Sequence, residues 1–113
     1  MGKFYCTLFL FLFLTGYSNA GDIYVTKYAY QADIKVFVAK YSYQADLLVF
    51  VADYSYQANN LDEVWYFVKS SFQADVTIYF TNYAYEADLT IYYVDYKYQA
   101  KWKNSHSWRG RLQ

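Results

Sequence analysis

Residues 28–40 have the sequence Tyr-Ala-Tyr-Gln-Ala-Asp-Ile-Lys-Val-Phe-Val-Ala-Lys, and residues 41–53 repeat the pattern as Tyr-Ser-Tyr-Gln-Ala-Asp-Leu-Leu-Val-Phe-Val-Ala-Asp. The glutamine position of this unit recurs at Gln31, Gln44, Gln57, Gln73 and Gln99, with Glu86 in one copy. The spacing is 13 residues except for one of 16, where three residues are inserted near Asn59-Asn60-Leu61. Chance does not produce six such copies, so the chain is a repeat protein.

The middle of each unit alternates as a β-strand does. In residues 34–39, Ile34, Val36 and Val38 alternate with other side chains, and residues 76–81 and 89–94 repeat this pattern. A period of two with β-branched and aromatic enrichment predicts strands. The opposite face carries one ring per copy: Tyr24, Phe37, Phe50, Tyr66, Tyr79 and Tyr92. We therefore expect both faces to be covered, in a compact two-layer body.

The links between these strands lack the residues of tight turns. The chain has no Pro, and after residue 20 its only glycines are Gly21 and Gly110. Two-residue hairpin turns need positive φ, which Gly or Asn usually supplies. We therefore expect the strands to bend, arch or wind into one another, with Asn59-Asn60 as the only ordinary turn.

The first twenty residues have the pattern of a secretory signal peptide. Lys3 precedes an apolar run of 11 residues, 4–14, and Ser18-Asn19-Ala20 places small residues where signal peptidase requires them. The alternatives are a buried first strand or a membrane anchor, but a spanning helix needs about 20 residues. We expect cleavage after Ala20, an exported (periplasmic or secreted) protein with no membrane span, and a single domain over residues 21–113.

Composition excludes several functional classes. Ten basic and ten acidic residues balance, so a strongly basic nucleic-acid binder is excluded, and 17 Tyr with 9 Phe exclude an acidic disordered tail. One Cys excludes a disulfide scaffold, and one His excludes most histidine-based metal and triad chemistry. We expect a monomer without a cofactor that binds no nucleic acid; its partner stays unknown.

The repeated aspartates invite two interpretations. They occupy one position of the unit, at Asp33, Asp46, Asp62, Asp75 and Asp88. We favour a structural role, in which each carboxylate accepts hydrogen bonds from backbone N–H or Tyr hydroxyl groups, and each repeated Gln binds the backbone of a neighbouring winding. The alternative is calcium binding, but calcium loops gather their carboxylates within about a dozen residues. The Tyr rings are expected to be buried with their hydroxyls at a polar layer.

The basic aromatic tail, residues 101–113, contains the single imidazole, His106. Nothing marks a base and a third group around a nucleophile, so we expect no enzyme, although paired carboxylates for glycoside hydrolysis stay open by count.

The tail itself is either a contact for nucleic acid or an anionic surface, or a structural terminus. We favour the second, in which Trp102 plugs one end of the core and the remaining residues are solvated.

The repeated Tyr-x-Tyr-Gln-Ala-Asp units, each followed by an aliphatic-x-Val-Tyr/Phe strand, resemble the 7(1) septoil knot domain family. Residues 64–68 (Val-Trp-Tyr-Phe-Val), residues 72–75 (Phe-Gln-Ala-Asp) and the ending Trp102-Lys103-Asn104 are especially similar. The resemblance covers about residues 22–104 and implies an all-β domain of six strand-plus-link units wound into a deep seven-crossing knot. The chain departs from its own pattern at Glu86, at the insertion, and at Lys101, where Asp is expected.

Four functions are compatible with these observations. The first is a non-catalytic extracytoplasmic domain with high kinetic stability and a structural or interaction role, which buried tyrosines would favour. The second, our alternative, is a glycan-binding module with an exposed aromatic strip. The third is an enzyme with a cleft that gathers several Asp residues. The fourth is a fibril-forming repeat with unpaired strand edges.

Overall fold

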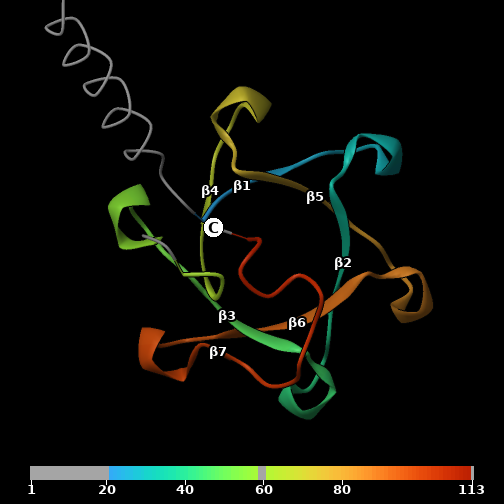
Figure 1. Ribbon diagram of the computed structural model, residues 1–113, viewed down its shortest axis with the longest axis vertical. Helices are drawn as coiled ribbons and strands as arrows, with labels where there is room; N and C mark the ends of the chain where they lie inside the picture. The colour runs from blue at the N-terminus through green and yellow to red at the C-terminus, as the bar shows by residue number, and fades with distance from the viewer. Residues whose placement is uncertain (1–20, 59–60, 113) are drawn as a thin grey trace, which may run out of the picture.

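The computed structural model describes residues 21–58 and 61–112 (Figure 1). The expected signal peptide and the expected turn at Asn59-Asn60 lie outside these residues. Seven strands are present in the described part: β1 (Asp22–Val25), β2 (Ile34–Val38), β3 (Leu47–Val51), β4 (Val64–Phe67), β5 (Val76–Phe80), β6 (Leu89–Val94) and β7 (Lys101–Trp102). Six single-turn 3-10 helices link them: η1 (Ala29–Gln31), η2 (Ser42–Gln44), η3 (Ser55–Ala58), η4 (Ser71–Gln73), η5 (Ala84–Glu86) and η6 (Lys97–Gln99).

The first six strands close into a barrel in which every pair is parallel. The strand order is β4-β1-β5-β2-β6-β3, and β3 also pairs with β4. In this ring β1, β2 and β3 stand apart from one another, and β5, β6 and β4 fill the gaps between them. The chain therefore passes around the barrel twice, and the strands of the second turn lie between those of the first (Figure 1).

The aliphatic face of the strands forms the interior of the barrel. The largest buried cluster contains Ile23, Ile34, Val36, Leu47, Val49, Trp65, Val76, Ile78, Leu89, Ile91 and Leu112. The rings on the opposite face, such as Phe37 and Tyr79, are half-buried. The all-β fold class is thus confirmed, but the expected two-layer body is a closed barrel, because the second turn fills the gaps that the first turn leaves open.

The links turn without glycine because they use 3-10 turns, which need no positive φ. In the first link Gln31 N–H donates to the Tyr28 carbonyl over 3.0 Å, and Ala32 N–H donates to the Ala29 carbonyl over 3.2 Å. Ala32 then returns to extended backbone at φ −85° and ψ 145°. Each link projects outward from the barrel, so the molecule has a ring of lobes (Figure 1). We call these lobes by the names of their 3-10 helices.

The seventh strand does not extend the barrel. Instead β7 pairs antiparallel with β3, and Lys101 lies opposite Leu48. The tail then crosses the middle of the ring (Figure 1), where Leu112 is fully buried in the core and Trp108 packs against it. The expectation of a solvated terminus beyond Trp102 is therefore wrong at Trp108 and Leu112, which supply part of the core, whereas residues 103–105, 107 and 109–111 are exposed.

Candidate functional site

Four of the repeated aspartates each clamp one residue of a neighbouring strand through two hydrogen bonds. Asp75 N–H donates to the Asp22 carbonyl over 2.8 Å, and Asp75 Oδ2 accepts the Asp22 N–H over 3.0 Å. The same pair of bonds joins Asp33 to Thr77, Asp46 to Thr90 and Asp88 to Lys35. Every clamp joins a strand of the first turn to a strand of the second, so these carboxylates hold the two turns together.

Asp62 has a different role, because the insertion precedes it. Its side chain is buried, and its oxygens accept hydrogen bonds from the Trp102 indole at 3.0 Å, from the Leu112 N–H at 3.1 Å and from the Gly110 N–H. Trp65 donates its indole N–H to the Asp62 carbonyl over 2.7 Å. Asp62 thus anchors the tail inside the barrel, and Trp102 packs against the core as part of the same arrangement.

The repeated Gln and Glu side chains bind within their own lobes. Gln31 Oε1 accepts the Thr26 hydroxyl and Glu86 Oε1 accepts the Thr81 hydroxyl, both over 2.8 Å. Gln57 and Gln99 accept backbone N–H groups three or four residues away. These four side chains therefore bind within their own link and not to a neighbouring winding as expected. The reason is that the 3-10 turn brings each side chain back onto its own link. Gln44 and Gln73 occupy the same place in lobes η2 and η4 and are exposed.

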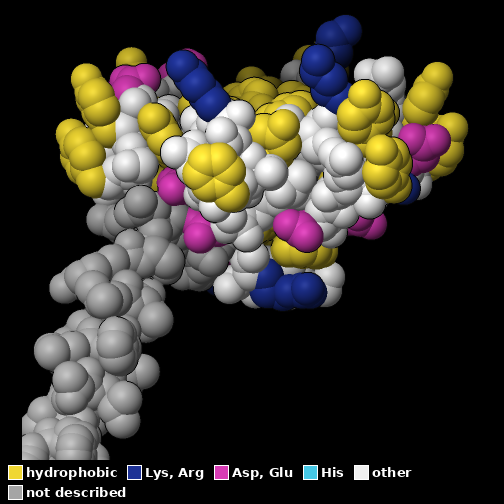
Figure 2. All heavy atoms as spheres, turned by 90° about the horizontal axis from the view of Figure 1, so that it is seen from above, with side chains coloured by type: hydrophobic (Ala, Val, Ile, Leu, Met, Phe, Trp, Pro, Cys, Tyr) yellow, Lys and Arg dark blue, Asp and Glu magenta, His cyan; other side chains and the backbone are white. Residues whose placement is uncertain are grey.

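The lobes expose their aromatic residues in pairs. In lobe η1 the rings of Tyr28 and Tyr30 lie 5.7 Å apart, and Tyr30 is 82% exposed. Four more lobes carry the same arrangement, in the pairs Tyr41–Tyr43, Tyr54–Tyr56, Tyr83–Tyr85 and Tyr96–Tyr98, with ring centroids 5.5–5.7 Å apart. Figure 2 shows hydrophobic side chains projecting around the rim of the molecule. The expectation of buried link tyrosines is wrong, because the core is filled by the strands and has no room for them.

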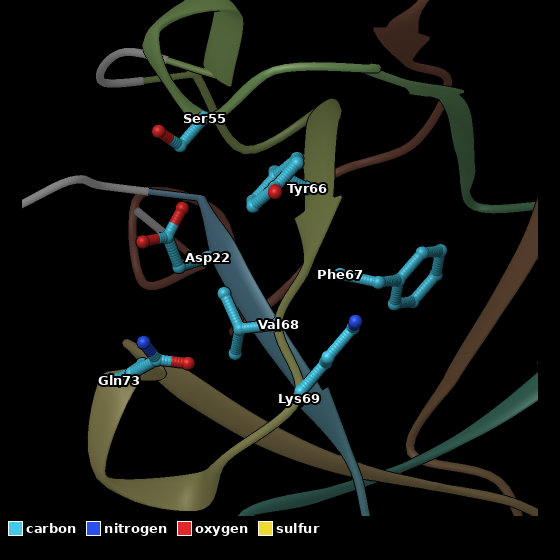
Figure 3. Close-up of a pocket in the computed structure, with 7 residues that line it drawn as sticks. All are labelled: Asp22, Ser55, Tyr66, Phe67, Val68, Lys69 and Gln73. Carbon is cyan, nitrogen blue, oxygen red and sulfur yellow. The ribbon is translucent and has the colours of Figure 1, made fainter.

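A pocket of about 530 Å³ lies between lobes η3 and η4, beside β1 and β4. We call it the β1–β4 notch, and it is lined by Asp22, Ser55, Tyr66, Phe67, Val68, Lys69 and Gln73 (Figure 3). The lining combines a carboxylate, an ammonium group, a hydroxyl, a phenol and an amide. Figure 3 shows the Asp22 carboxylate directed into the space between Ser55 and Gln73. Such a mixture suits a polar ligand of modest size.

Asp22 is the electrostatically unusual group of this notch. Its side chain is 5% exposed, and Oδ1 is buried without a hydrogen-bond partner among the residues that the structure describes. Burial first, and then the Asp75 carboxylate, raise the pKa of Asp22 from 3.8 to about 6. A buried, incompletely satisfied carboxylate is rare in proteins and calls for an explanation.

A second notch of about 310 Å³ is related to the first by the repeat. It lies between lobes η2 and η6 and is lined by Ser42, Leu48, Tyr92, Tyr93, Val94, Asp95 and Gln99. Each strand residue lies 26 positions after its counterpart, so Leu48 stands where the first notch has Asp22. We call this the β3–β6 notch. The repeat thus builds two similar notches and gives an acid at this position to the first of them.

Sequence reasoning selected the clamp residues but missed the notch. Asp22 lies outside the repeated aspartate position, so the repeat pattern does not select it. Aligning the units would have revealed it, because its counterparts are Lys35, Leu48, Val64, Thr77 and Thr90, none of them acidic.

The tail residue His106 makes structural contacts: its Nδ1 accepts the Trp108 N–H over 3.0 Å, so Nε2 carries the proton and donates to the Asp88 carbonyl over 2.9 Å.

Within residues 21–58 and 61–112, no three His, Cys, Asp or Glu side chains are grouped as a metal ion would need. In the same residues no helix has the length and apolar character to cross a membrane.

The strand order and the clamps define a class of protein. A chain that passes twice around a closed parallel barrel, with each turn lying between the strands of the other, is an interleaved β-repeat protein. Residues 20–103 match the 7(1) septoil knot domain, which covers most of the chain. The chain therefore belongs to the 7(1) septoil knot domain family, as its repeated units indicated. No curated protein and no solved structure matched it.

Proposed function

We propose that this domain is a non-catalytic extracytoplasmic binding module that contacts carbohydrate through the paired aromatic residues of its lobes. The observation that carries the proposal is the exposure of these rings, which contribute nothing to the core. Exposed aromatic groups on a soluble protein commonly mark interaction sites. A sugar ring offers an apolar C–H face that packs on an aromatic ring, and its hydroxyls bond to phenols.

The arrangement of the lobes suits a repeating polymer. Single aromatic contacts are weak, but several lobes that engage one chain or surface at once raise the overall affinity by effective concentration. The closed barrel also holds the lobes on a rigid support, which lowers the entropy lost on binding. By contrast, each of β1 to β6 pairs on both sides, so the unpaired edges that fibril formation needs are not found among them.

Binding to insoluble cellulose and chitin tests the proposal. A variant that carries Tyr30→Ala, Tyr43→Ala, Tyr85→Ala and Tyr98→Ala should lose at least tenfold in affinity, while the melting temperature stays close to that of the wild type. A matched control removes exposed charges from the same region through Lys27→Ala, Lys40→Ala and Lys97→Ala and should still bind. Equal binding by both variants, or no binding by the wild type, would exclude these rings as the contact surface.

Export is part of the proposal and has its own test. We expect the mature protein to begin at Gly21, which mass spectrometry of the protein recovered outside the cytoplasm would show. Recovery of a chain that retains Met1 from the cytoplasm alone would contradict the extracytoplasmic role.

A further inference from the structure

The β1–β4 notch has a buried acid where its counterpart has a leucine. The two notches share a serine, a tyrosine and a glutamine at matching places: Ser55, Tyr66 and Gln73 in the first, and Ser42, Tyr92 and Gln99 in the second. At the position contributed by β1 in the first notch and by β3 in the second, the first notch has Asp22 and the second has Leu48. Both are buried, but leucine fits a buried site without cost, whereas a carboxylate needs hydrogen-bond donors.

The structure supplies Asp22 with fewer donors than a buried carboxylate needs. Its own backbone N–H is committed to Asp75 Oδ2, and its Oδ1 has no donor within the described residues. The neighbouring acid, Asp75, adds negative charge. A group that brings both a positive charge and N–H donors would satisfy this site.

We propose that the β1–β4 notch is a subsite for an amino sugar, whose protonated primary amine binds the Asp22 carboxylate. This inference rests on the proposed carbohydrate function and names the sugar class at one site. The remaining lining residues complete the subsite: the Ser55 hydroxyl and the Gln73 amide face sugar hydroxyls, and the Tyr66 ring offers a packing face (Figure 3). An N-acetylated sugar lacks the charge and leaves Asp22 unsatisfied.

The pH dependence follows from the groups around Asp22. The titratable groups that the structure places there are Asp75 from the start of β5, Lys69 from the end of β4 and Tyr66 from β4. Since the pKa of Asp22 is raised to about 6, its carboxylate is neutralised as the pH falls through 6, and affinity for an amine should fall with it. Affinity should also fall at high pH, where the amine loses its proton.

The experiment uses glucosamine oligomers and N-acetylglucosamine oligomers of equal length, measured by calorimetry at pH 7 with the mature domain. We expect the glucosamine oligomer to bind more tightly by about ten- to a hundredfold, the range of a charged hydrogen bond. Asp22→Asn should remove this preference while the folded state persists. Ser55→Ala with Gln73→Ala should weaken binding of the glucosamine oligomer, whereas the matched pair Ser42→Ala with Gln99→Ala in the β3–β6 notch should not.

The outcomes separate this inference from the proposed function. If both oligomers bind equally and the four-tyrosine variant loses both, the carbohydrate function stands and the amine subsite is wrong. If the glucosamine oligomer binds preferentially but Asp22→Asn keeps that preference, the subsite is also wrong. If neither oligomer binds, nor cellulose nor chitin, both proposals fail.

Discussion

Asp75 joins the two turns of the chain at a single residue pair. Its backbone and its carboxylate both bond to Asp22, so replacing the side chain leaves the Asp22 N–H without its acceptor. The three other clamps repeat this arrangement, so four of the repeated aspartates bridge the two turns in the same way. The expectation that these carboxylates accept backbone N–H groups is met at Asp33, Asp46, Asp75 and Asp88.

Removing one clamp should therefore destabilise the domain. We expect Asp75→Ala to lower the free energy of unfolding by about 1–3 kcal/mol, the cost of an unpaired donor. Thermal unfolding followed by circular dichroism measures the loss, and the exposed Asp95→Ala is the control, expected to stay within about 0.5 kcal/mol of the wild type. A strong rise of the melting temperature with calcium that Asp75→Ala abolishes would replace the structural interpretation by a metal site.

The ionised carboxylate of Asp22 should lower the stability of the domain, whereas the carboxylate of Asp75 should raise it. Its pKa is raised on folding, so the folded state binds a proton more readily than the unfolded state, and stability falls as the pH rises from about 4 to 6. The shift from 3.8 to about 6 corresponds to at most roughly 3 kcal/mol at pH 7. Asp22→Asn should be more stable than the wild type at pH 7 and should lose this difference at pH 4. Equal stability of the two proteins at both pH values would contradict the raised pKa.

At the scale of elements, the tail is the least expected part of the structure. Leu112 is fully buried in the barrel, and its N–H donates to Asp62 Oδ1 over 3.1 Å. Trp108 packs beside it, and the Arg111 guanidinium lies 4.2 Å from the centre of the Trp108 ring. The tail crosses the middle of the ring (Figure 1), and β7, which has two residues and runs antiparallel to β3, does not continue the repeat.

Truncating Leu112 should consequently be costly. We expect Leu112→Ala to destabilise the domain by about 2–5 kcal/mol, the range for a buried leucine. Arg109→Ala, on an exposed residue of the same tail, should change stability by less than about 0.5 kcal/mol. Chemical denaturation that ranks the two variants equally would mean that the tail is not packed in the core.

The strands could be predicted from sequence because alternation and repeat spacing are local. The closed ring could not, since Ile34 pairs with Ile78 and Leu47 with Ile91, and no local pattern encodes such partners. The sequence predicts links without tight hairpins but not the projecting lobes, and their tyrosines were expected inside because aromatic content alone does not say which side chains are buried. The notch escaped prediction because its residues come from three separate units.

At the scale of the whole molecule, two turns that lie between one another cannot separate one strand at a time. Each strand of the second turn is bonded on both sides to strands of the first, including β4, which pairs with β1 and β3. To leave the native state, the chain must lose many long-range contacts together, and to unknot fully a terminus must also pass back through the body. We therefore expect a high unfolding barrier without unusual equilibrium stability.

The interleaved winding is tested by comparing unfolding and refolding in guanidinium through the combined fluorescence of Trp65, Trp102 and Trp108. We predict that the two curves disagree unless samples equilibrate for days, with unfolding near the slow end of small domains, about 10⁻⁶ per second in water. Rapid, reversible, single-exponential kinetics whose rate ratio reproduces the equilibrium constant would contradict the winding.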